Sequence, residues 1–126
     1  MTEQGAFQLV LPGVVNLQAL VRRSGKCDAE DFLRLLNDRY RARYLRYLQY
    51  LAAGIPIKSP ENYRVLRKRD THGILVAEIK VDKFRLYVIN HDSHWYLSHG
   101  RDKPKDSQVV REVEKALNFY QQSLKG

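Results

Sequence analysis

The chain has 126 residues and a formal net charge of +8, from 22 lysines and arginines against 14 acidic residues. Its hydrophobic content of 44% is ordinary for a folded domain, so we expect a single domain over residues 1–126 and exclude wholesale disorder. No apolar run is long enough to span a bilayer, and the N-terminus lacks the pattern of a signal peptide. Cys27 is the only cysteine, which excludes an internal disulfide. These features predict a cytoplasmic protein with an acidic partner, which could be nucleic acid, an acidic protein or an anionic membrane surface.

The first half of the chain is predicted to hold one strand and a long helical segment. Residues 7–11 form a short apolar run that is typical of a strand. Residues 14–26 are ambiguous, because Val14-Val15 and Leu17–Val21 fit either a strand or a short helix, and Ser24–Lys26 fit a loop. Over residues 28–53 apolar side chains recur at spacings of three and four, and Asp28 is a suitable helix cap. A break at Asn37–Asp38 would divide this segment into a helical hairpin, because both residues are mediocre helix formers.

The second half is predicted to form strands followed by one helix. Residues 63–66 fit an extended segment. Alternating side chains and tight turns predict a meander of three strands at 74–80, 84–90 and 94–99. Apolar residues at helical spacing then predict a final helix over about 108–124. The order β-α-α-β-β-β-α indicates an α+β fold, with a small antiparallel sheet, an N-terminal helical hairpin and a C-terminal helix.

The strand at 84–90 carries the most informative side chain, Arg85. An arginine in mid-strand must reach water or an anion, since a buried unpaired charge is too costly. The next strand ends in His99, and a basic loop with Lys103 follows it. Together these residues suggest a surface that handles phosphate. The alternatives are a surface arginine paired with Glu78 across the hairpin and a structural histidine at a strand end.

A family resemblance covers about residues 27–124. It rests on four stretches: Asp31-Phe32-Leu33 with the helix that follows, the loop from Gly54-Ile55-Pro56 to Leu66, the strand pair Ala77–Lys80 and Phe84–Tyr87, and His99-Gly100 followed by Lys103 and Arg111–Leu117. In this order they resemble the RelE/ParE/HigB superfamily of small toxins, most closely its phage-derived, HigB-like branch. The chain departs from the family's pattern at Arg101, where the family has phenylalanine, and at Pro104, which interrupts a lysine pair.

The resemblance implies a RelE-like fold and the toxin of a type II toxin–antitoxin pair. Such a toxin would be a metal-independent, ribosome-dependent endoribonuclease without a cofactor, and its partners would be mRNA on the ribosome and a cognate antitoxin protein. Some members of the family do not cut RNA. The alternatives are therefore a gyrase-inhibiting toxin and a phage-derived module that binds RNA or protein.

The resemblance also implies roles for particular residues. Arg85 would clamp the phosphate, His99 would transfer protons and Lys103 would contact the phosphate, so we expect all three to face one concave patch. Further RNA contacts are expected from a set of cations, namely Arg67, Lys68, Lys80, Arg101 and Lys105. We expect no metal site, because His91, Asp92 and His94 share one tight turn.

Overall fold

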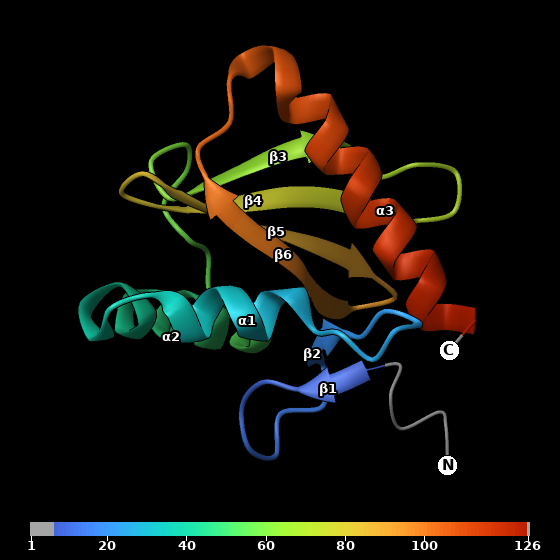
Figure 1. Cartoon of the computed structure of the whole chain (residues 1–126), viewed down its shortest axis with the longest axis horizontal. Coiled ribbons are helices and arrows are strands. Elements are labelled where there is room, and N and C mark those ends of the chain that lie inside the picture. The colour runs from blue at the N-terminus through green and yellow to red at the C-terminus, as the bar shows by residue number, and fades with distance from the viewer. Residues whose placement is uncertain (1–6, 126) are drawn as a thin grey trace.

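The structure is a computed structural model that describes residues 7–125, and it has a twisted six-stranded sheet with helices on both faces (Figure 1). In chain order the elements are β1 (Phe7–Leu9), β2 (Leu17–Leu20), α1 (Asp28–Leu35), α2 (Asp38–Ala53), β3 (Tyr63–Arg67), β4 (Leu75–Val81), β5 (Phe84–His91), β6 (His94–Asp102), the 3-10 turn η2 (Asp106–Gln108) and α3 (Val109–Lys125). The α+β class and the meander of β4, β5 and β6 are confirmed. Among the described residues, no helix combines the length and the apolar character needed to cross a membrane.

The strands follow the order β1-β2-β6-β5-β4-β3, and one pair of neighbours is parallel. Leu17 of β2 pairs with Trp95 of β6, and Ala19 pairs with Leu97. The prediction of a purely antiparallel sheet is therefore wrong at this point. The sequence left the segment around β2 ambiguous between strand and helix, because its partner strand β6 lies near the other end of the chain. Both β2 and β3 add strands to the predicted order.

Side-chain alternation divides the sheet into two packed faces. Leu86 and Val88 of β5 belong to a core cluster that α1 and α2 cover. Ile89, of opposite parity, belongs to a second cluster with Val113 and Phe119 of α3. Successive strand residues point to opposite faces, so one strand contributes to both cores. Figure 1 shows α3 crossing in front of the sheet.

The predicted break between the first two helices is confirmed, and two side chains explain it. Asn37 precedes α2, and its side chain accepts a hydrogen bond from the backbone N–H of Tyr40 at 3.0 Å. Arg41 donates hydrogen bonds to the carbonyls of Leu33 and Arg34 in the last turn of α1, where a helix leaves carbonyls without intrahelical partners. Asp28 does not cap α1. It is the first helical residue, and its carboxylate pairs with Arg22 at 2.7 Å.

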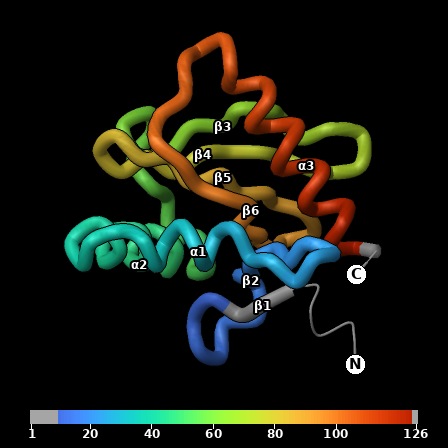
Figure 2. Tube along the Cα trace, in the orientation of Figure 1, coloured from blue at the N-terminus to red at the C-terminus, as the bar shows by residue number. Residues whose placement is uncertain are grey.

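The path of α3 decides which part of the sheet stays uncovered. The connection after β6 arches away from the sheet, and α3 then crosses back over it from the β3 side toward β2 (Figure 2). Near the C-terminal end of α3, the Ser123 hydroxyl donates to the carbonyl of Val21 at 3.1 Å. Because α3 crosses at an angle, the ends of β3, β4 and β5 near the start of α3 are left partly open.

Candidate functional site

The sheet register aligns polar side chains in two rows on the face that α3 crosses. The first row, read from β3 to β6, is Arg64, Glu78, Tyr87 and His99. The second row, read from β4 to β6, is Lys80, Arg85 and Arg101. Residues directly opposite each other on neighbouring strands lie side by side, so each row is continuous across the sheet.

A small pocket of about 80 Å³ opens where α3 leaves these rows uncovered. Its lining residues come from β3, β4, β5 and the segment before α3; they are Arg64, Glu78, Lys80, Arg85, Lys103, Pro104, Asp106 and Val109. Four cationic side chains face two carboxylates, so the lining is net positive. Val109 is the first residue of α3, and a helix N-terminus adds partial positive charge. The pocket therefore favours an anion.

Arg85 lies in this pocket together with Lys103, as the sequence predicts. Arg85 is 9% exposed, and its Nη1 atom donates to the carbonyls of Asp82 at 2.9 Å and Phe84 at 2.8 Å. Its Nε atom is 3.9 Å from a carboxylate oxygen of Glu78. The guanidinium of Arg85 is thus held in place by the β4–β5 turn, while part of it remains at the pocket wall.

Sequence reasoning missed Arg64, which faces Glu78 across the β3–β4 pair. The Nε atom of Arg64 is 3.0 Å from the second carboxylate oxygen of Glu78. The Arg64 side chain is 47% exposed, whereas that of Glu78 is 3% exposed. This pair can be found only when the pairing register of β3 and β4 is known. One amino-acid sequence does not show which residues of two strands face each other.

His99 does not line this pocket. It is 2% exposed, and its ring stacks on Tyr87 with 4.8 Å between ring centroids. Its Nε2 atom is 2.8 Å from Glu112 on α3, and its Nδ1 atom is 2.8 Å from the Ser98 hydroxyl. The expectation that His99 shares one concave patch with Arg85 and Lys103 is therefore wrong, because α3 covers this part of β6.

Charge assigns the hydrogen-bond directions around His99. Burial lowers the pKa of His99, which the hydrogen bond to Glu112 opposes only in part, so the ring is neutral near pH 7. Burial alone would raise the pKa of Glu112, but hydrogen bonds from His99 and Arg101 outweigh it and lower that pKa. The Nε2–H of His99 then donates to an ionised Glu112, and the Ser98 hydroxyl donates to Nδ1. Arg101 also donates to Glu112, at 2.9 Å.

Of the remaining predicted RNA-binding residues, four do not line the pocket: Arg67, Lys68, Arg101 and Lys105. Lys80 lines the pocket. Arg67 and Lys68 are exposed at the end of β3, and Arg67 lies 4.0 Å from Asp70. Lys105 is exposed just before η2. Arg101 lies in β6 rather than in a loop, because β6 extends to Asp102.

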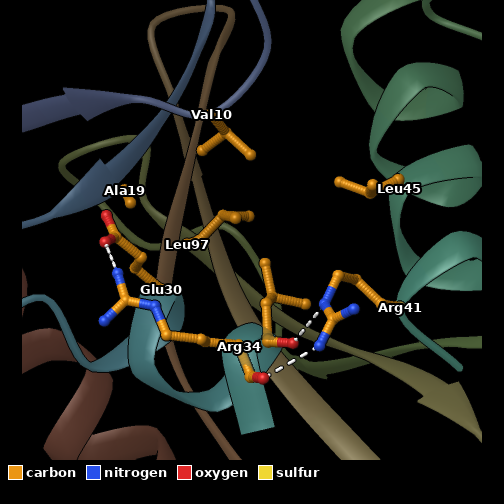
Figure 3. Close-up of a pocket in the computed structure, with 8 residues that line it drawn as sticks. Val10, Ala19, Glu30, Arg34, Arg41, Leu45 and Leu97 are labelled. Carbon is orange, nitrogen blue, oxygen red and sulfur yellow. Dashed lines mark hydrogen bonds and ion pairs between the residues drawn. The ribbon is translucent and has the colours of Figure 1, made fainter. Parts of the chain in front are cut away.

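A larger pocket, of about 360 Å³, lies between α1, α2 and the neighbouring strands (Figure 3). Figure 3 shows Arg34 paired with Glu30. Arg41 donates hydrogen bonds to the main-chain carbonyls of Leu33 and Arg34. The other residues that line this larger pocket are apolar; they are Val10, Ala19, Leu33, Leu45 and Leu97. Arg41 here links α2 to the end of α1, whereas the Arg34–Glu30 pair lies within α1. None of the predicted site residues lines this pocket.

Comparisons with family models, with curated proteins and with solved structures found no match. The resemblance to the RelE/ParE/HigB superfamily thus stays an expectation. Within residues 7–125, no group of three or more His, Cys, Asp or Glu side chains is arranged to hold a metal ion.

Proposed function

We propose that the chain is the toxin of a type II toxin–antitoxin pair and that it binds and cleaves RNA at the cationic pocket. One observation carries the RNA-binding part of this proposal, and the toxin–antitoxin part rests on the family resemblance. Cations from β3, β4, β5 and the loop after β6 meet at a pocket of about 80 Å³; they are Arg64, Lys80, Arg85 and Lys103. Guanidinium and ammonium groups suit the oxygens of a phosphodiester. The proposed partners are mRNA on the ribosome and a cognate antitoxin that covers this basic face.

The proposed reaction needs no metal. The 2′-oxygen of a nucleotide attacks the adjacent phosphorus, and the bond from phosphorus to the 5′-oxygen breaks. The products are a 2′,3′-cyclic phosphate and a 5′-hydroxyl end. Negative charge builds up on the phosphate oxygens, and cations fixed beforehand stabilise it without reorganising. Arg85 meets this condition because two backbone carbonyls already hold its guanidinium.

Proton transfer in this proposal falls to pocket residues and not to His99, whose two ring nitrogens are both engaged. Three titratable side chains of the lining, Lys80, Lys103 and Asp106, form no ion pair with another described residue. The Asp106 carboxylate accepts the proton of the 2′-hydroxyl, and the Lys103 ammonium gives a proton to the departing 5′-oxygen.

Regulated expression in a bacterial host tests this proposal. We expect growth arrest and cut mRNA, mapped by primer extension, and relief when the neighbouring gene is co-expressed. Arg85→Ala should reduce cleavage about a hundredfold or more, because a preorganised contact to the developing charge is lost. Arg23→Gln is the matched control. It removes one exposed arginine near the C-terminal end of α3, far from the pocket, and should cut like the parent.

A non-catalytic role is the second candidate, and the burial of His99 favours it, because the pocket then lacks a histidine for proton transfer. A module that only binds RNA would retain oligonucleotide affinity without cutting. A gyrase-inhibiting toxin would stop growth while mRNA stays intact. A parent protein that neither cuts RNA nor slows growth would overturn the toxin proposal.

A further inference from the structure

We propose that Arg64 is a phosphate-binding residue and that Glu78 positions the guanidinium groups of Arg64 and Arg85 around one phosphate. The inference rests on the proposed function, because it concerns the same pocket. It adds a binding residue and a positioning residue that the sequence did not predict. The ligand class is a phosphodiester group of single-stranded RNA.

The geometry shows one carboxylate shared by two arginines. One oxygen of Glu78 is 3.0 Å from Nε of Arg64, and the other is 3.9 Å from Nε of Arg85. Arg64 is directly opposite Glu78 in the β3–β4 pair, and Arg85 lies one step diagonally away on β5. Glu78 is nearly fully buried, so it cannot turn outward to water without breaking both contacts.

Both arginines keep donors free for a ligand. A guanidinium has five N–H groups. Arg64 forms its ion pair with Glu78 through Nε, and its two terminal nitrogens form no hydrogen bond with other described residues. Arg85 uses Nη1 on two carbonyls, which leaves Nη2 without such a bond. Terminal nitrogens of two arginines on one pocket wall suit two oxygens of the same phosphate.

The charge of Glu78 explains why two arginines can sit so close together. Two guanidinium groups repel each other, and a carboxylate between them offsets that repulsion. A buried carboxylate is costly unless it is paired, and here each of its oxygens has a cationic partner. The same carboxylate weakens the general attraction of the pocket for anions. If Glu78 positions the arginines, removing its charge should weaken RNA binding. If only the general attraction for anions matters, removing this charge should strengthen RNA binding.

Equilibrium binding to a single-stranded, 2′-O-methylated RNA oligonucleotide tests the role of Arg64. Such RNA cannot be cut, because the attacking hydroxyl is blocked, and fluorescence anisotropy reports its affinity. Arg64→Gln should weaken binding about tenfold and reduce its salt dependence. Arg64→Lys keeps the positive charge but loses the two-pronged guanidinium group, so its RNA affinity should lie between those of the parent and Arg64→Gln. The control Arg23→Gln should stay within about twofold of the parent.

Glu78→Gln tests the positioning role, since it keeps the shape and removes the negative charge. If Glu78 positions the arginines, the variant binds RNA more weakly even though its net charge is more positive. If only general attraction matters, the variant binds more tightly. Circular dichroism checks the fold, and Glu78→Asp replaces this variant if it does not fold. Glu78→Asp keeps the charge but shortens the reach to the arginines, so weaker binding is again expected.

The outcomes separate this inference from the proposed function. A parent protein that binds no RNA overturns both. RNA binding by the parent that Arg64→Gln leaves unchanged overturns this inference alone. Tighter or equal binding by the folded Glu78 variant overturns the positioning role of Glu78 and leaves Arg64 as one cation among four.

Discussion

At the scale of single residues, His99 shows how burial changes the role of a titratable side chain. Its position at the end of a predicted strand fits catalysis and structure equally well. In the folded chain it links β6 to α3 through Glu112, and Ser98 and Tyr87 occupy its other sides. We infer that His99 keeps the start of α3 on the sheet and thus helps to fix the side of the pocket that α3 forms.

Replacing His99 tests this structural role. His99→Ala should lower the free energy of unfolding by about 2–4 kcal/mol, because it opens a cavity and removes a hydrogen bond from a buried carboxylate. Urea unfolding measures the change. His72→Ala, in an exposed turn, is the control and should change stability by less than about 0.5 kcal/mol. If His99→Ala abolishes RNA cleavage at unchanged stability, the histidine takes part in proton transfer after all.

Acidification should destabilise the protein in two steps. The folded-state pKa of His99 is lowered from 6.5, so the unfolded chain takes up this proton first as the pH falls. Stability is therefore lost below about pH 6.5. The pKa of Glu112 is lowered from 4.5, so its contribution is present above that pH and is lost as the pH falls further.

Urea unfolding at about pH 7.5 and about pH 5.5 measures the first of these steps. The loss of stability on acidification should be larger in the parent than in His99→Gln, which cannot take up the proton. An equal loss in the two proteins would show that His99 is not buried as a neutral ring.

The candidate site could be predicted only in part, and particular residues show why. Arg85 stood out because alternation places a charge within an apolar strand, and Lys103 followed from the basic loop. Arg64 carried no such signal, since half-exposed arginines on strands are common. The burial of His99 depends on Glu112, thirteen positions away on a helix whose rotation no local pattern defines. Contacts between elements, rather than residue types, decided these outcomes.

At the scale of elements, α1 and β6 approach each other so closely that no room is left for a side chain at Gly100. A Cβ atom built at Gly100 would lie 2.3 Å from the Phe32 ring, well inside any allowed contact. Phe32 in turn packs edge-on against Tyr44 and Phe84. The glycine of the His99-Gly100 pair is therefore explained by packing on the face opposite the cationic pocket.

A double-mutant cycle tests this explanation. Gly100→Ala should destabilise the protein by about 1–3 kcal/mol, because the rigid ring and both backbones must shift. The same substitution should cost much less in a Phe32→Ala background, where the ring is absent. Thermal unfolding of the parent, the two single variants and the double variant gives the coupling energy between positions 32 and 100. Additive effects would mean that the strand backbone, and not Phe32, requires glycine.

The elements differ in how much the sequence told about them. β5 could be predicted clearly, because its side chains alternate along eight residues and a tight turn is expected at each end. The segment that became β2 was ambiguous, since its apolar residues fit a strand or a helix equally well. Its parallel pairing with β6 joins distant parts of the chain. Such a pairing depends on how α1, α2 and the meander fold back, which local propensity does not determine.

At the scale of the whole molecule, the net charge of +8 should make RNA binding depend strongly on salt. If each of the four pocket cations neutralises one phosphate of a single strand, log affinity should fall with log salt at a slope of about −3. Affinity would then drop about fiftyfold between roughly 50 and 200 mM salt. Anisotropy titrations measure this, and Lys103→Gln should make the slope shallower by about 0.7. Equal affinity at both salt concentrations would show that the basic face does not bind RNA.

The position of β3 at the edge of the sheet has a consequence for how the protein behaves at high concentration. β3 pairs with β4 on one side only, and an open edge can add a strand from another molecule. Arg64 and Arg67 lie in β3, and Lys68 and Arg69 follow directly. Four like charges at one edge repel a second copy, which is a common protection against aggregation. The arginine proposed to hold phosphate thus also helps to keep the molecules apart, and an apolar residue at position 64 would remove the phosphate contact and weaken the repulsion at the same time.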